Sequence, residues 1–323
     1  MAYLRNLHTN EKLYLLNHHI FGRHNGAVDT AISQPDVSKI HASIKWSGQH
    51  WQLCDLSRNG TWLDKKRLPP ADSIALKIGQ LISFANLSQQ SWRVESLDSP
   101  RNLLVGLNDC STTTTLSHYH LIPNDDKPLA AIFLCHTRGQ WVLEKRAGNC
   151  SNNDDEHETL ITNNDTIEFG QYKWQLFLDS EQQTLERLNN KANSKQCEFL
   201  FEVSLDEEHT QLSLQYCNDK IDLGERSHHY LLLHLARLKA DHAKQGIDLK
   251  NQGWLNNELL AKELGIDPSH INLLIFRARK QITEAFPNML GIADFLQRRR
   301  GEVRFNCPQA TVVKGATTER LSA

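Results

Sequence analysis

Long apolar segments are missing from this sequence of 323 residues. No uninterrupted apolar run approaches the roughly 20 residues that a membrane-spanning helix needs. The first residues, MAYLRNLHTNEKLYLL, lack the charged and then apolar pattern of a signal peptide. The sequence therefore predicts a cytoplasmic protein that does not contact a membrane.

Paired cysteines and catalytic strings are also missing. The seven cysteines are spread thinly, with no CxxC pair, which indicates reduced thiols rather than a disulfide framework or a zinc site. No GxSxG, HExxH, Walker A or GxGxxG string is present. The adjacent pairs His18-His19 and His228-His229 are not spaced to share a face as metal ligands do. We therefore expect a binding protein without enzymatic activity, metal or cofactor.

A large net charge is missing as well. The 36 Lys and Arg residues nearly balance the 38 Asp and Glu residues, which leaves a formal net charge of −2. The whole chain therefore has no strong attraction for nucleic acid, and any nucleic-acid surface must be local. The length suggests two or three domains.

The N-terminal part of the sequence has a β-type pattern. Residues 1–98 contain short apolar runs such as KLYLL, ASIKW, HWQLCDL and SWRVES, separated by Gly, Pro, Asn and Asp, which is typical of a β-sandwich. Residues 103–178 repeat the order of a strand, a Gly-containing turn, a Trp strand, a long loop, an I-x-F run and a second Trp strand. We interpret this stretch as a diverged second copy of the first domain.

The remaining third of the chain changes character. Residues 179–196 are polar and suit a linker. Residues 197–308 begin with β-type runs and continue with helical patterns, the last of them started by Asp267-Pro268, a capping Asp with Pro at the first helical position. A basic hairpin around Gly301 follows. Residues 309–323 are expected to be a disordered tail.

Three short motifs in the first domain occur in a fixed order: Gly22-Arg23, then Ser38-x-x-His41, then Asn59-Gly60-Thr61. On an all-β background, this order resembles the forkhead-associated (FHA) domain, over about the first hundred residues. One departure is the sequence DKK, where the family usually has a further Asn-Gly turn.

The chemistry of these motifs suits an anion. An arginine offers a planar, permanently charged fork to a phosphate, and a hydroxyl adds a second donor. The resemblance implies that Arg23 and Ser38 hold the phosphate of a phosphothreonine and that Asn59 holds the main chain of the ligand. Lys39 and Arg58 flank this site, either as phosphate contacts or as solvated charges. Four residues are expected to be structural: Gly22, His41, Gly60 and Thr61.

The sequence of the second copy lacks the residues expected to bind phosphate. Aligning VGLND on FGRHN places Leu107 at the position of Arg23, and no Asn-Gly-Thr follows the Trp strand. A packing or dimerising role is therefore expected, which allows a homodimer. The tract Thr112–Thr115 is interpreted as a solvated loop, with phosphorylation by a kinase as the alternative.

The C-terminal pattern resembles the winged-helix output domain of OmpR/PhoB-type response regulators, and thus implies an α+β winged helix-turn-helix fold. Its third helix and hairpin carry the candidate DNA-binding residues Arg277, Arg279, Lys280, Arg298, Arg299, Arg300 and Arg304. At about 100° per residue, Leu273 and Phe276 fall on the helix face opposite the buried stripe. They could contact thymine methyl groups or a protein.

These features favour a transcriptional regulator. Its FHA domain would dock on a phosphothreonine-containing protein, such as a Ser/Thr kinase or a substrate of one, and its winged helix would bind duplex DNA. The alternative is a phosphoprotein-binding adaptor or scaffold whose winged helix contacts protein.

Overall fold

The structure, a computed structural model, describes most of the chain; the described residues are 1–86, 91–107, 113–116, 118–135, 138–145, 158–169, 172–178, 197–216, 218–286, 292–307 and 309–321. Contacts divide the chain into two compact units. The first comprises residues 1–115, 163–167 and 173–186, and the second comprises residues 116–162, 168–172 and 187–323. The predicted linker, residues 179–196, lies outside the described residues.

Eleven short strands in residues 3–96 form a β-sandwich, as the sequence predicts. One sheet has the order β2-β1-β11-β10-β7-β8 and the other β4-β3-β5-β6-β9. The strands of the first sheet are β1 (Tyr3–Asn6), β2 (Lys12–Tyr14), β7 (Thr61–Leu63), β8 (Lys66–Arg67), β10 (Leu81–Phe84) and β11 (Ser91–Ser96). Those of the second are β3 (His18–Gly22), β4 (Thr30–Ala31), β5 (Ala42–Trp46), β6 (Trp51–Asp55) and β9 (Ser73–Ala75).

Alternation along these strands builds the core of the sandwich. In β6, Trp51 and Leu53 point inward and are fully buried, while Gln52 and Cys54 are only partly covered. The inward residues of both sheets belong to one apolar cluster, which includes Leu4 and Ile82. A sheet with one buried face requires this period of two.

Residues 103–177 repeat the strand order of the sandwich. Their sheets have the orders β13-β12-β19-β18 and β14-β15-β16-β17, which match β2-β1-β11-β10 and β3-β5-β6-β9 of the first domain. The strands are β12 (Leu103–Gly106), β13 (Thr113–Thr115), β14 (Tyr119–Ile122), β15 (Ala130–Cys135), β16 (Gln140–Lys145), β17 (Glu158–Ile161), β18 (Thr166–Phe169) and β19 (Tyr172–Phe177). Thr113–Thr115 therefore form an edge strand and not the expected loop; Thr112 lies outside the described residues.

The hydrogen-bond register corrects the sequence alignment of the two copies. His41 N–H donates to the carbonyl oxygen of Phe21, and Leu129 N–H donates equivalently to that of Ile122, both at 2.8 Å. Arg23, two residues after Phe21, therefore corresponds to Asn124 and not to Leu107. Leu107 follows β12, which is the counterpart of β1. The sequence alignment was wrong because it rested on the similarity of two short strings. The correspondence between the copies is set by the register of the paired strands.

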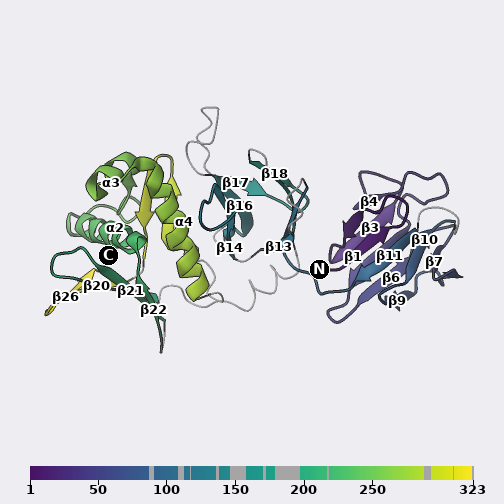
Figure 1. The fold of residues 1–323 in the computed structure, drawn as a ribbon, viewed down its shortest axis with the longest axis horizontal. Helices are drawn as coiled ribbons and strands as arrows, with labels where there is room; N and C mark the ends of the chain where they lie inside the picture. The colour runs from purple at the N-terminus through teal and green to yellow at the C-terminus, as the bar shows by residue number, and fades with distance from the viewer. Residues whose placement is uncertain are drawn as a thin grey trace. The chain divides into compact units, whose positions relative to one another are not determined.

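The C-terminal part is an α+β domain. A five-stranded sheet of order β22-β21-β20-β26-β27 packs with three helices and a three-stranded sheet of order β23-β25-β24 around one apolar core. Figure 1 shows α4 beside α2 and α3. The elements are β20 (Cys197–Val203), β21 (Thr210–Tyr216), β22 (Asp219–Glu225), α2 (Ser227–Lys244), β23 (Leu255–Asn256), α3 (Asn257–Leu264), α4 (Pro268–Ala285), the 3₁₀ turn η2 (Ile292–Phe295), β24 (Leu296–Arg299), β25 (Glu302–Phe305), β26 (Gln309–Lys314) and β27 (Thr317–Leu321).

Local signals set the ends of these helices. Asn256 caps α3 by accepting hydrogen bonds from the N–H groups of Glu258 and Leu259, and α3 ends at Gly265 with a φ of 65°. Asp267 caps α4 by accepting from the Ser269 N–H at 2.8 Å. The predicted start of this helix is confirmed.

The expected disordered tail is wrong. Residues 309–321 form the hairpin β26–β27, and β26 pairs in parallel with β20. Ala310, Val312 and Leu321 are buried in the domain core. The β-branched residues Thr311, Val312 and Val313 favour a strand, but the strand that pairs with them is more than a hundred residues away in sequence.

Within the described part of the chain, no helix is long and apolar enough to cross a bilayer. The same described part has no group of three or more His, Cys, Asp or Glu side chains placed to hold a metal ion.

Candidate functional site

The loops at one end of the first sandwich bring the motif residues together. The Arg23 N–H donates to the Ser38 carbonyl oxygen at 2.9 Å, and the His24 N–H donates to the Lys39 carbonyl oxygen at 3.3 Å. These two loop segments approach so closely that a Cβ on Gly22 would lie 2.2 Å from the Lys39 oxygen. Glycine at position 22 therefore allows Arg23 and Ser38 to sit side by side.

His41 joins this pair of loops to a third. The Nδ1 atom of its fully buried ring accepts from the Ser38 N–H at 3.0 Å. Its Nε2 therefore carries the proton and donates to the Gly60 carbonyl oxygen at 3.1 Å. Burial lowers the pKa of His41 below the usual value. The neutral ring is a scaffold for the site rather than a ligand-binding group.

Asp55, which sequence reasoning missed, organises the third loop. Its buried Oδ1 accepts from the Ser57 N–H at 3.0 Å, the Ser57 hydroxyl at 2.7 Å and the Thr61 hydroxyl at 2.9 Å. The Ser57 Oγ in turn accepts from the Gly60 N–H at 2.7 Å. Gly60 has a φ of 99°, in the left-handed region that favours glycine. The spacing Asp-x-Ser just before the turn was the available signal.

Asn59 and Arg58, on this third loop, form hydrogen bonds to the loop that carries Ser38. The Asn59 Nδ2 donates to the Asp36 carbonyl oxygen at 2.6 Å, and the Arg58 N–H donates to the Ser38 Oγ at 3.3 Å. The Asn59 side chain is exposed, and its Oδ1 has no partner among the described residues. The Ser38 hydroxyl hydrogen also stays free to donate. Both groups can therefore contact a ligand from outside.

The site carries an uncompensated positive charge. Arg23, Lys39 and Arg58 are exposed, and none has a carboxylate within 4.0 Å among the described residues. Arg67 is a further cation that the sequence did not indicate. It lies over the Trp62 ring at 5.8 Å and donates through Nη2 to the Arg58 carbonyl oxygen at 3.5 Å. Four cations thus surround the exposed donors.

Comparison with known families identifies this region. The model of the FHA domain family matches residues 19–85, which contain all three loops. The chain carries an N-terminal FHA domain. FHA domains are phosphopeptide-binding modules. No curated protein sequence matched the chain.

Solved structures with similarity to the FHA region come from several organisms. Mycobacterium tuberculosis EmbR, in complex with a low-affinity phosphopeptide, is 22% identical, with a TM-score of 0.27; the match covers 31% of this chain and 25% of the EmbR chain. The N-terminal FHA domain of S. cerevisiae Rad53p, with a phosphothreonine peptide, is 19% identical over 30% of this chain and 93% of that chain, with a TM-score of 0.28. The FHA domain of an Arabidopsis thaliana hypothetical protein is 26% identical over 31% and 87%, with a TM-score of 0.28.

Outside the FHA domain, the structure separates the candidate DNA-binding residues into two groups. The first group is at least partly exposed, and all of its members except Arg277 lie on the hairpin β24–β25. Arg299 and Arg304 flank the Trp254 ring at 4.3 and 4.5 Å from its centroid. Arg300, at the turn of the hairpin, is exposed, and Arg277 on α4 is half-buried.

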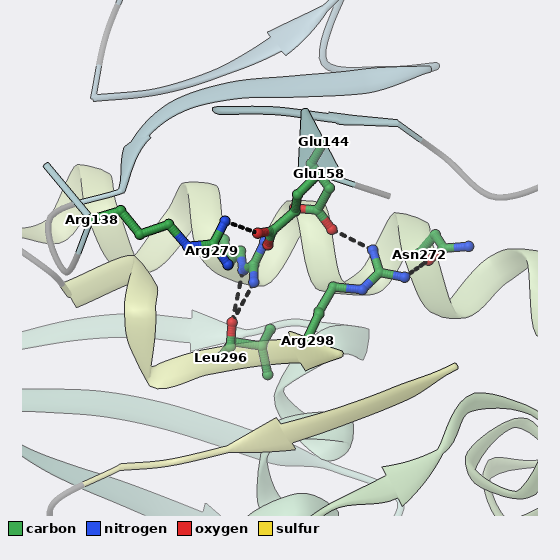
Figure 2. Close-up of polar contacts among 7 residues, drawn as sticks. All are labelled: Arg138, Glu144, Glu158, Asn272, Arg279, Leu296 and Arg298. Carbon is green, nitrogen blue, oxygen red and sulfur yellow. Dashed lines mark hydrogen bonds and ion pairs between the residues drawn. The ribbon is translucent and has the colours of Figure 1, made fainter. Parts of the chain in front are cut away.

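The second group is covered, contrary to the expectation of an open helix surface. Arg279 and Arg298 have side chains only 4% and 3% exposed, and both donate to the fully buried carboxylate of Glu144 on β16 (Figure 2). Lys280 pairs with Asp125, in the loop after β14. The reason is that the outward face of α4 packs against the β14–β17 sheet. Phe276 is fully buried there, so this face meets protein of the same chain.

Proposed function

We propose that the FHA domain binds a phosphothreonine in a Ser/Thr-phosphorylated partner protein. Arg23 and Ser38 hold the phosphate, Asn59 holds the ligand main chain, and Lys39 and Arg58 add positive charge at the rim. The observation that carries this proposal is the convergence of an exposed arginine, a free hydroxyl and a free amide oxygen on three loops fixed by His41. A permanently charged fork beside neutral donors matches a phosphate dianion.

The proposal is tested with the full-length chain and a phosphopeptide library. Calorimetry should show binding to peptides that contain phosphothreonine and none to the same peptides without phosphate. Phosphoserine peptides are the comparison for the threonine preference that the FHA resemblance implies. Equal binding with and without phosphate would overturn the assignment.

We further propose that the C-terminal α+β domain binds duplex DNA, which makes the chain a phosphothreonine-dependent transcriptional regulator of the cytoplasm. The observation in favour is the stack of Arg299 and Arg304 on Trp254 beside the exposed Arg300. The stack holds cations on a projecting hairpin, where they can contact phosphates or enter a minor groove.

The second candidate is a phosphoprotein adaptor whose C-terminal domain contacts protein. The burial of Phe276 against β14–β17 favours it, because this face of α4 already meets a protein surface. Crosslinking of the tagged full-length protein to genomic DNA, with and without the Ser/Thr kinases of the cell, distinguishes the two. Discrete kinase-dependent peaks are expected for the regulator, and protein partners without peaks for the adaptor.

A further inference from the structure

The outer face of the β14–β17 sheet differs from the same face of the FHA domain. In the FHA sheet, this face carries polar residues such as His18, Lys45 and Gln52. In the second copy, the register places apolar residues at the corresponding positions, and all of them are buried: Tyr119, Phe133 and Val142. All six residues of β15 are buried, which is typical of a strand covered on both faces. The second copy has therefore become a docking surface.

Helix α4 occupies this docking surface. Phe276 packs among Tyr119, Phe133 and Val142. Asn272, Phe276 and Arg279 follow one another at i, i+4 and i+7, so they share one face of the helix. Asn and Arg are the residue types that most often read adenine and guanine edges. A face with this composition is unusual for a permanent core contact, because it buries an Asn and an Arg.

Two carboxylates of the β14–β17 unit neutralise the cations of this face. Glu144, fully buried, accepts from both Arg279 and Arg298 (Figure 2). Asp125, whose side chain is 62% exposed, pairs with Lys280. Glu158, near Glu144, is paired with Arg138 of its own sheet at 3.0 Å. Lys280 also pairs with Glu284 of its own helix at 3.6 Å. Arg279 and Arg298, by contrast, share the single carboxylate of Glu144.

We propose that the face of α4 and β24 formed by Asn272, Phe276, Arg279, Lys280 and Arg298 binds duplex DNA, and that the β14–β17 sheet covers it in this conformation with Glu144 and Asp125 in place of DNA phosphates. This masking by the sheet rests on the proposed DNA binding and adds a way to regulate that binding. Carboxylate and phosphate oxygens compete for the same guanidinium forks, since both accept bidentate charge-assisted hydrogen bonds. DNA and the sheet therefore exclude each other on this face.

The test uses the full-length chain and fluorescence anisotropy with a pool of labelled random-sequence duplexes at several salt concentrations. The variant Glu144→Gln/Asp125→Asn removes both carboxylates without changing side-chain size. It is expected to bind DNA about tenfold or more tightly than the wild type at low salt. Its salt slope should steepen by roughly two to three units, since Arg279, Arg298 and Lys280 would each neutralise a phosphate.

The matched control is Asp206→Asn/Glu207→Gln, in the turn after β20. Glu207 also pairs with two cations, Arg237 at 3.0 Å and Lys314 at 2.7 Å, so the control removes equal charge from the same domain but away from α4. Its affinity for DNA should stay close to that of the wild type. If the control variant gained the same affinity for DNA, the effect would be explained by net charge alone, and the proposed masking of the α4 face would be overturned.

The remaining outcomes separate the cover from DNA binding itself. If the wild type and the Glu144→Gln/Asp125→Asn variant bind DNA equally well, the proposed masking of this face by the β14–β17 sheet is wrong, while the proposed DNA binding is retained. If neither protein binds DNA at low salt, the proposed DNA binding is wrong, and the proposed masking by the sheet is wrong with it. Circular dichroism checks folding. Should the double variant unfold, Asp125→Asn alone removes an exposed charge and is expected to give about a two- to threefold gain with about one unit of salt slope; no gain would overturn the cover.

Discussion

At the scale of single residues, the proposed phosphate site depends on groups other than those that would contact the ligand. His41 fixes the Ser38 and Gly60 loops, and Asp55 fixes the turn that carries Asn59. The side chains proposed to contact the ligand are exposed, but their loops are held by the hydrogen bonds of the buried His41 and Asp55. Such second contacts are what keep a binding site in its productive geometry.

Arg23→Ala should weaken phosphothreonine binding about ten- to a hundredfold. A charge-assisted contact to phosphate is worth about 1.5–3 kcal/mol, and no neighbouring side chain can replace the fork. Calorimetry on the full-length chain measures the loss, with Arg93→Ala on the exposed face of β11 as the control. Equal phosphate-dependent binding by the wild type and Arg23→Ala would contradict the assignment of Arg23 to the phosphate.

Gly22→Ala should destabilise the FHA domain by about 1–3 kcal/mol, which is the usual cost of inserting a methyl group into a closely packed region. The new Cβ would lie 2.2 Å from a backbone oxygen of Lys39, so the Arg23 and Ser38 loops must separate. Phosphopeptide affinity should fall with stability. In Gly26→Ala, four residues along, the Cβ meets His24 at an ordinary 3.5 Å, and both quantities should be nearly unchanged in urea unfolding and calorimetry.

At the scale of elements, the same strand order serves two purposes in one chain. In the FHA domain, the loops carry the proposed site, and the outer face of the β3–β5–β6 sheet carries polar residues such as Lys45 and Gln52. In the second copy, the loop position of Arg23 holds Asn124, and the sheet face is apolar and covered by α4. Loops and faces of one fold can thus diverge independently, because function belongs to the site and not to the fold.

The hairpin β26–β27 offers a test at this scale. Val312 on β26 is buried in the core, while the neighbouring Val313 points to the other face and is only partly covered. Val312→Ala should lower the free energy of unfolding by about 1.5–3 kcal/mol, from two lost methylene equivalents and a residual cavity. Val313→Ala should cost less than half as much. If chemical unfolding shows no effect of Val312→Ala, the tail does not pair with β20 as described.

At the scale of the whole molecule, both units bury neutral histidines. Desolvation lowers the pKa of each of them, to about 4 for His19 and for His228. The others, with a lowered pKa and the same leading cause, are His41, His120 and His229. A native state with several such groups binds fewer protons than its unfolded chain in mildly acidic solution.

The chain should therefore lose stability as the pH falls below about 6.5, the ordinary histidine pKa. Each group has a folded pKa below its unfolded value, so its contribution is present above about pH 6.5 and is lost as the pH falls towards the folded value. Each histidine contributes at most about 1.4 kcal/mol per pH unit. Urea midpoints measured between about pH 7 and pH 5 should fall steadily. A constant midpoint over this range would show that these rings are not buried and neutral.

The sequence by itself determined the β-sandwich and the order of the helices, and it singled out the residues proposed for the FHA site. These depend on local quantities: a period of two along strands, the capping residue Asp267, and glycines at turns. The residues Arg23, Ser38 and Asn59 could be proposed from the sequence because each belongs to a short motif with its own chemistry.

Only the tertiary structure decided which surfaces are covered. Arg279 and Arg298 have the sequence pattern of solvated cations, and Gln309–Leu321 that of a frayed end, yet the first two meet Glu144 and the last pairs with β20. Their partners lie more than a hundred residues away in the chain. No local pattern encodes such a contact, because burial depends on the surface that the rest of the chain brings to that residue.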